Sequence, residues 1–130
     1  DTSPSSNTSV NGITSVSSVD ASTSGISRAL YIKSNGNYDF ADADAASTMP
    51  CVALAVETGT GSKKIVHYGF ATNSSWSWTT GGLIYVSTTS GQLTQTPPTG
   101  TGDQVQIVGY ATSATTIFFN PSYVTVEVGP

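Results

Sequence analysis

The stretch Ser75–Pro98, SWSWTTGGLIYVSTTSGQLTQTPP, constrains the fold more than any other part of the chain. Two tryptophans lead into a Gly-Gly pair. A short apolar run at Leu83–Val86, a polar turn at Thr88–Gly91 and a second short run follow, and two prolines end the stretch. Gly and Pro interrupt regular structure, and the apolar runs between them are too short for ordinary helices. The pattern therefore predicts a β-domain built from short strands.

A hairpin is predicted near the start of the regular strand pattern, around the pair Asn35 and Gly36. Asn-Gly tolerates the two positive φ angles of a type I′ turn, whose twist matches that of the flanking strands. With a two-residue turn of this type, Tyr31 would lie opposite Phe40 across the ladder.

Further strands follow at regular intervals, separated by turns rich in Gly, Thr, Asn and Pro. Cys51–Val56 is a continuous apolar run, which is typical of a strand buried on both faces. Tyr123–Val128 alternates apolar and polar residues and predicts a half-buried antiparallel strand with its valines on one face. The sequence therefore predicts an all-β fold, a compact antiparallel sandwich or barrel of about eight short strands.

Residues 1–27 differ from the β-domain predicted for residues 28–130, because they consist mostly of Ser, Thr, Asn and Gly. Four apolar residues recur there at every third position, namely Val10, Ile13, Val16 and Val19. One interpretation is an extended N-terminal arm that orders against a partner subunit or around a symmetry axis, with these four residues along one edge. The other is a Ser/Thr-rich tail with accidental spacing.

The chain carries little charge. Charged residues make up 9% of it, against roughly a quarter in ordinary soluble domains, and the net charge is −4. Four Lys and Arg residues do not supply the cation cluster that nucleic acid or an anionic membrane surface requires. A surface whose polarity comes from Ser and Thr repels its neighbours weakly, which suits a protein packed beside other subunits.

Few residues offer chemistry. His67 is the only histidine and lies in a strand pattern, so we expect a structural role. Cys51 is the only cysteine, and its apolar surroundings predict a buried, unreactive thiol. The sole His and the sole Cys lie far apart in the sequence and no acid/base pair is evident, so we expect no enzymatic activity and no cofactor.

The one acidic cluster has the spacing D-x-x-D-x-D, at Asp39, Asp42 and Asp44. Carboxylates are the hard oxygen ligands that Ca²⁺ prefers, but only part of a six- to eight-ligand set is visible. A solvated loop is the favoured interpretation, and a cation site is the weaker alternative.

The aromatic residues Trp76 and Trp78 are the clearest candidates for binding, together with Tyr110. Residues i and i+2 of an extended segment share one face, and exposed flat rings could stack on sugars. The competing interpretation is that both tryptophans pack in the core or in a subunit interface, because tryptophan is highly buried on average.

Several blocks of the sequence resemble a β-domain that recurs in structural proteins of tailed bacteriophages. The resembling residues are WSWTTGGLIYVSTTSGQLTQTPP (Trp76–Pro98), VQIVGYA (Val105–Ala111), TIFFNP (Thr116–Pro121), TMPCVALAVETGTG (Thr48–Gly61) and the YGF motif at 68–70. The resemblance covers roughly the last 80 residues, a length at which one domain is normally complete.

This resemblance implies a non-enzymatic virion structural protein displayed on the particle surface, commonly as a homotrimer. A capsid decoration (cement) protein held by its N-terminal arm is the expected function, with the major capsid protein or other virion subunits as partners. The alternatives are a receptor- or carbohydrate-binding module of a tail fibre, with a host surface glycan as ligand, and a subunit of an extracellular filament.

Overall fold

A computed structural model describes residues 8–23 and 28–129 of the chain. Within these residues the fold is all-β, as predicted, with one short 3₁₀ turn, η1 (Ala46–Thr48). The strands are β1 (Thr8–Thr23), β2 (Arg28–Ile32), β3 (Tyr38–Phe40), β4 (Ala53–Ala55), β5 (Gly59–Asn73), β6 (Leu83–Val86), β7 (Leu93–Thr94), β8 (Gln104–Val105), β9 (Ile107–Ala111), β10 (Thr116–Phe119) and β11 (Val126–Glu127).

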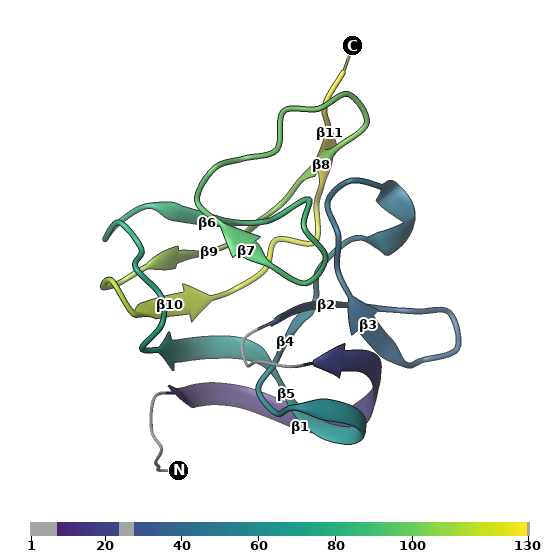
Figure 1. Ribbon diagram of the computed structural model, residues 1–130, viewed down its shortest axis with the longest axis vertical. Coiled ribbons are helices and arrows are strands. Elements are labelled where there is room, and N and C mark those ends of the chain that lie inside the picture. The colour runs from purple at the N-terminus through teal and green to yellow at the C-terminus, as the bar shows by residue number, and fades with distance from the viewer. Residues whose placement is uncertain (1–7, 24–27, 130) are drawn as a thin grey trace.

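Two parts share the long strand β5. Strands β1, β3, β2, β4 and β5 follow one another in the sheet, and pairing of β1 with β5 closes them into a ring. Beyond β5 the sheet continues through β10, β9, β6 and β7. Figure 1 shows this extension above β5 and the separate two-stranded ribbon β8–β11 near the C-terminus. The fold therefore combines a small barrel with a sheet that extends from it.

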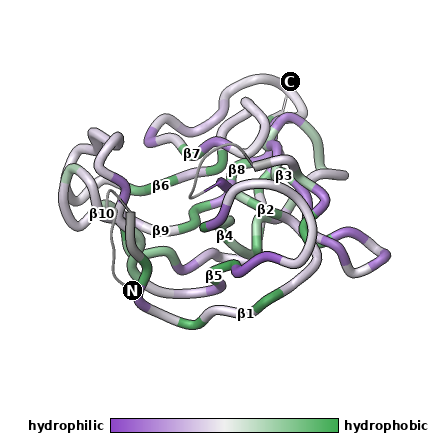
Figure 2. Tube along the Cα trace, turned by 60° about the horizontal axis from the view of Figure 1, so that its bottom comes forward, coloured by the Kyte–Doolittle hydropathy of each residue, from purple (hydrophilic) through white to green (hydrophobic). Residues whose placement is uncertain are grey.

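The core consists of two apolar clusters, which lie on opposite faces of β4 and β5. In β4, Ala53 and Ala55 belong to the smaller cluster with Ile65, while Leu54 belongs to the larger one with Phe119. The prediction that Cys51–Val56 is buried on both faces is confirmed for this strand, whose three residues are all buried. Figure 2 shows hydrophobic stretches along the strands and hydrophilic ones at many of the connections. Burial of a Val, Leu, Ile or Phe side chain stabilises the fold by about 1.5–3 kcal/mol.

Residues 8–23 of the expected arm form β1 and pair with β5 of the same chain, from Thr8 opposite Asn73 to Thr23 opposite Gly59. Together with Val19 and Ala21, which are buried in the smaller cluster, this pairing makes the segment part of the β-domain. Residues 1–7 and 24–27 of the expected arm lie outside the described residues.

The four apolar residues of the segment do not lie along one edge. Val19 is buried and Val10 packs against the larger cluster, whereas Ile13 is 63% exposed and Val16 is 71% exposed. A strand repeats every two residues, so a spacing of three places successive members on alternate faces. The expected single stripe is therefore wrong.

The hairpin predicted at Asn35-Gly36 is present, but its register differs. The Lys33 amide donates to the Asn37 carbonyl and the Gly36 amide to the Lys33 carbonyl, and Gly36 has a φ of 88°. This geometry is a three-residue connection ending in a left-handed glycine, not a two-residue turn. The strands pair as Leu30 with Phe40, Tyr31 with Asp39 and Ile32 with Tyr38. The predicted pairing of Tyr31 with Phe40 is therefore wrong by one residue.

The C-terminal segment also departs from the prediction. Only Val126 and Glu127 form a strand, β11, which pairs with β8. Val124 is 71% exposed and Val126 is 63% exposed, so the predicted half-buried strand at Tyr123–Val128 is wrong. An alternating pattern requires a second layer to cover its apolar face. The ribbon contacts the larger cluster through Gln104, whose amide donates to the Ala43 carbonyl, but Val124 and Val126 of the C-terminal segment belong to neither cluster.

Candidate apolar contact surface

The extended part of the sheet leaves an apolar surface exposed. We call this surface the aromatic face and define it by six residues on strands β5, β6, β9 and β10, namely Tyr68, Phe70, Leu83, Ile107, Tyr110 and Phe118. Five of them are 41–47% exposed, and Phe118 is half-buried among its neighbours. Ile13 of β1, which is opposite Tyr68 in the ladder, continues the surface across a fifth strand.

Strand register brings the aromatic side chains together. Phe118 is opposite Phe70 on β5 and opposite Tyr110 on β9, and Tyr110 is in turn opposite Leu83 on β6. The ring centroid of Phe118 lies 5.0 Å from that of Phe70, 5.8 Å from that of Tyr110 and 5.3 Å from that of Tyr68. These separations are in the range of favourable aromatic pairs. The rings therefore form one connected cluster with Phe118 at its centre.

Alternation along the strands determines which side chains reach this surface. On β10, Ile117 and Phe119 are buried in the core, so Phe118 between them faces away from it. In the part of β5 next to β10, Gly69 and Ala71 are buried, and the exposed residues are Tyr68 and Phe70. A one-sided antiparallel sheet usually carries polar residues on its outer face. Here the outer positions are aromatic, which is the pattern of a contact surface.

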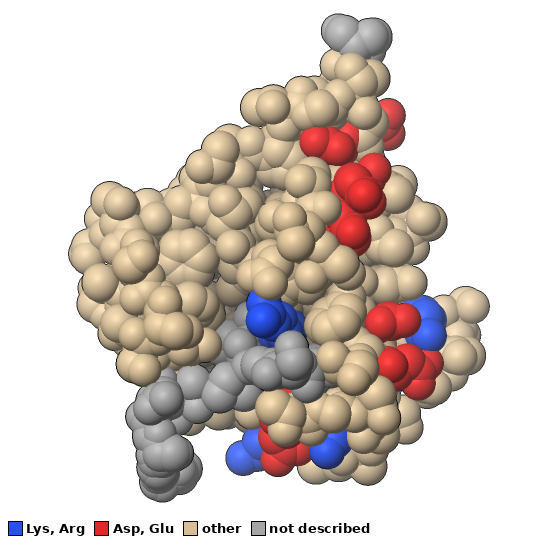
Figure 3. All heavy atoms as spheres, in the orientation of Figure 1, with Lys and Arg blue, Asp and Glu red and all other residues tan. Residues whose placement is uncertain are grey.

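The part of the chain that forms this surface carries almost no charge. Between Lys64 and Glu127 the sequence carries a single charged residue, Asp103. Figure 3 shows Lys, Arg, Asp and Glu side chains around the barrel and along the opposite side of the molecule, while the lobe formed by β6, β9 and β10 has none in this view. The aromatic face therefore lies in a surface region with no ionised side chain of its own.

A pair of glycines allows β1 and β5 to approach each other closely at the edge of the aromatic face. Gly12 lies opposite Gly69, and a Cβ atom on Gly12 would overlap the carbonyl oxygen of Tyr68. A Cβ on Gly69 would likewise overlap the carbonyl oxygen of Asn11. The close approach of the two strands requires residues without a side chain, and it places Ile13 beside Tyr68.

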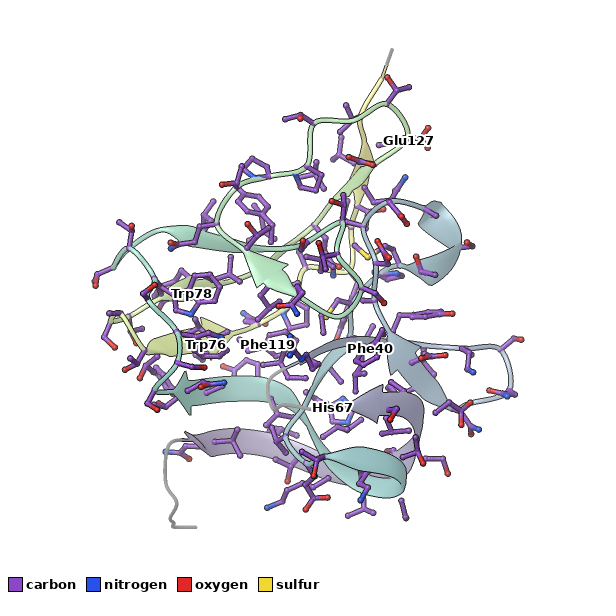
Figure 4. The ribbon with its side chains drawn as sticks, viewed as in Figure 1. Phe40, His67, Trp76, Trp78, Phe119 and Glu127 are labelled. Atoms are coloured by element: carbon purple, nitrogen blue, oxygen red, sulfur yellow. The ribbon has the colours of Figure 1, made fainter. Side chains whose placement is uncertain are left out.

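The three predicted ligand-stacking residues are divided between two surroundings. Trp76 and Trp78 lie with their ring centroids 5.5 Å apart and pack, half-buried, against the larger core cluster. Figure 4 shows them beside each other near Phe119. The indole Nε1 of Trp78 is buried without a hydrogen-bond partner among the described residues. Tyr110 instead belongs to the aromatic face.

Sequence reasoning missed Tyr68, Phe70 and Phe118. The available signal was the YGF motif of residues 68–70, because aromatic residues two positions apart on a strand must share a face. A second strand with an aromatic residue between two buried apolar positions, at Phe118, completes the pattern.

His67 occupies a β-bulge. The register of β5 against β1 shifts between Ile13 and Thr14, which leaves His67 as the extra residue. Its Nε2 atom lies 2.7 Å from Ser15 Oγ. The centroid of its ring lies 6.3 Å from that of the Tyr38 ring, in an edge-to-face arrangement. A Ser-His pair needs a third group that orients the imidazole before the serine becomes a nucleophile. The hydrogen bonds described for His67 do not include a carboxylate that could do this.

The three acidic residues of the weak cation candidate have separate roles. Asp39 accepts from the Phe40 amide and lies 3.4 Å from Lys33 Nζ, while Asp42 Oδ1 accepts from the Asp44 amide. Burial raises the pKa of the Asp42 carboxyl; the hydrogen bond from the Asp44 amide opposes this rise, and the Asp44 carboxylate adds to it. No group of three His, Cys, Asp or Glu side chains among the described residues is placed to hold a metal ion.

Cys51 is a buried free thiol. Its Sγ lies 3.5 Å from the carbonyl oxygen of Ala53, and burial raises the pKa of the thiol to about 12. A thiol of this kind is a weak nucleophile because the thiolate form is scarce at neutral pH.

A pocket of about 300 Å³ lies beside β7, where hydroxyl groups and prolines line it together with Asp103. None of the predicted site residues reaches this pocket, and the Asp103 carboxylate already accepts from the Gly100 amide.

Within residues 8–23 and 28–129, no helix is long and apolar enough to cross a membrane.

Comparison with known proteins gives no relative: no family, no curated protein and no solved structure matches this chain.

Proposed function

We propose that this protein is a non-enzymatic structural protein of a bacteriophage particle. In this role it decorates the capsid surface and binds neighbouring subunits through apolar contact. The observation that carries the proposal is the aromatic face, an outer sheet surface with exposed Tyr68, Phe70 and Tyr110 in place of polar residues. An exposed apolar patch of this kind is typical of interaction sites in soluble proteins.

Two further features support an assembly role. The low charge of the whole chain reduces electrostatic repulsion between subunits that lie side by side. The sequence blocks that resemble bacteriophage structural proteins include Tyr68, Phe70, Tyr110 and Phe118, four residues of the aromatic face. We therefore propose that the protein self-associates and contacts the major capsid protein or other virion subunits at the particle surface.

Immunogold labelling of particles purified from the source tests this function. The proposal predicts regular label over the heads when an antibody against this protein is used, with particles treated with preimmune serum as the control. Label confined to tails or fibres contradicts capsid decoration and favours receptor binding. Absence of label from every particle contradicts the virion role.

A carbohydrate-binding module of a tail fibre is the second candidate. The exposure of Tyr68 and Tyr110, at 47% and 44%, favours it because sugar rings stack on flat aromatic surfaces. This candidate predicts that an oligosaccharide from the host surface binds the wild-type protein and that Tyr110→Ala abolishes binding. Titration calorimetry with the Val124→Ala variant as the control distinguishes the two candidates.

A further inference from the structure

We propose that the aromatic face is the contact between copies of this chain, so that a second copy presenting the same face covers it. The proposal rests on the assembly role given above and assigns the surface through which self-association occurs. Phe118 and the rings around it would lie at the centre of this contact, where residues are most completely removed from water.

The size of the surface fits such a contact. An aromatic side chain buries about 150–250 Å², so rings that are close to half exposed leave about 100 Å² each in water. Together with Ile13, the aromatic face exposes on the order of 600 Å² of side chain per copy. Two copies would then bury on the order of 1,200 Å², the lower limit for specific interfaces.

The distribution of charge favours a second copy over a charged partner. A partner with an acidic or basic surface would find no complementary side chain on the aromatic face, because the residues from 65 to 102 and from 104 to 126 are uncharged. Two copies that meet here bring no like charges of the face together. The lobe formed by β6, β9 and β10 likewise shows no ionised side chain in the view of Figure 3.

Polar groups beside the rings argue against a sugar as the occupant. Sugar recognition requires hydrogen-bonding groups near the stacking rings. Thr72 and Thr116 share the outer side of the sheet with Phe70 and Phe118, but their hydroxyl groups bond each other at 2.8 Å. This internal hydrogen bond uses one of the two hydroxyl protons, so the pair offers a sugar fewer donors, whereas an apolar protein surface requires none.

Sedimentation velocity over a range of concentrations tests the proposal with three proteins. We expect the wild type to sediment as an oligomer. In Tyr110→Lys the new charge would be desolvated in the contact and face its own copy, so self-association should weaken at least about tenfold. The matched control is Val124→Lys, which makes the same charge change at an exposed apolar residue outside the aromatic face and should sediment like the wild type.

Circular dichroism verifies that each variant is folded, and Phe70→Lys replaces Tyr110→Lys if the latter does not fold. A monomeric wild type, or a folded Tyr110→Lys that remains associated, overturns the proposal. A monomeric wild type whose Tyr110 ring signals in NMR spectra shift on addition of an oligosaccharide overturns it in favour of a sugar site. Labelled particles together with a monomeric protein would leave the virion function standing and remove only this contact.

Discussion

Two glycines set the distance between β1 and β5 at the place where the aromatic face begins. Neither Gly12 nor Gly69 can carry a side chain, because the backbone of the facing strand occupies the space of a Cβ atom. Gly69 also adopts a φ of 140°, which other residues rarely tolerate. These two residues therefore have a stronger effect on the sheet than their size suggests.

Replacing Gly12 by alanine should lower the free energy of unfolding by about 1–3 kcal/mol, because the new methyl group forces the two strands apart. Urea denaturation measures the change. The matched control is Gly129→Ala, where a Cβ meets nothing within 4 Å and the effect should stay within about 0.5 kcal/mol. Equal stabilities of the two variants would contradict the close approach of β1 and β5.

Cys51 should give the protein an alkaline limit of stability. Its pKa is raised from 9.0 to about 12 in the folded state, so above pH 9 the unfolded chain loses the thiol proton and the folded chain keeps it. The contribution of the protonated Cys51 thiol to the free energy of unfolding is fully present below pH 9. Between pH 9 and pH 12 this contribution decreases by at most about 1.4 kcal/mol per pH unit.

The measurement is urea denaturation at several alkaline pH values, with Cys51→Ala as the comparison, which should show a shallower decline. A thiol reagent should modify wild-type Cys51 only after unfolding. Rapid modification of the folded protein at pH 8 would contradict the burial of this residue.

Some residues resist prediction because their roles depend on partners distant in sequence. Gln106 is 1% exposed, although its neighbours suggest a simple strand. Its side chain donates to the carbonyl groups of Cys51 and Ser122 and accepts from the Cys51 amide. From sequence alone, a polar residue in a strand is expected to point outward. Its burial can be predicted only when the backbone groups that bond its side chain are known. The burial of the Cys51 thiol, in contrast, could be expected from its apolar neighbours alone.

At the scale of the element, β1 behaves as a strand of period two. Val19→Ala should lower the free energy of unfolding by about 2 kcal/mol, because it removes buried methyl groups from the smaller cluster. Val16→Ala is the matched control on the same strand, and its loss of β-propensity alone should cost less than about 1 kcal/mol. Thermal or urea unfolding of both variants measures the difference. Equal losses of stability in the two variants would contradict the packing of Val19 of β1 in the core of the same chain.

Short-range patterns predicted many of the strands, but not all of them and not every partner. The apolar run at Cys51–Val56 gave a correct expectation, because burial on both faces leaves a continuous apolar signature. Residues 8–23 did not, since a Ser/Thr-rich sequence with apolar residues three apart has no strand periodicity. This segment becomes a strand because β5 is long enough to pair with most of it, from Thr8 to Val19 and again at Thr23. The alternating pattern of Tyr123–Val128 predicted a half-buried strand, but none of the described residues forms a layer over Val124 and Val126, which are exposed.

At the scale of the whole molecule, none of the six residues of the aromatic face is ionised, although exposed apolar residues elsewhere, such as Val16 opposite Lys64, lie beside charges. The barrel and the loops near the ribbon carry the ionised residues, and the extended sheet carries the aromatic face (Figures 1 and 3). The sequence indicated the all-β class and named Tyr110, together with Trp76 and Trp78, as a candidate ligand-stacking residue. It could not place Tyr110 with Phe118 and Phe70, because that grouping depends on the order of β5, β10 and β9 in the sheet.

Hydroxyl-radical footprinting of the assembled and the dilute, dissociated protein tests most directly whether the aromatic face is a contact surface. Tyr123, which is 68% exposed and lies outside this surface, provides the internal reference. The prediction is that assembly lowers the oxidation of Tyr68 and Tyr110 several-fold relative to Tyr123, because removal from water protects both rings. Unchanged oxidation of Tyr68 and Tyr110 in the assembled protein would contradict an assembly role for the aromatic face.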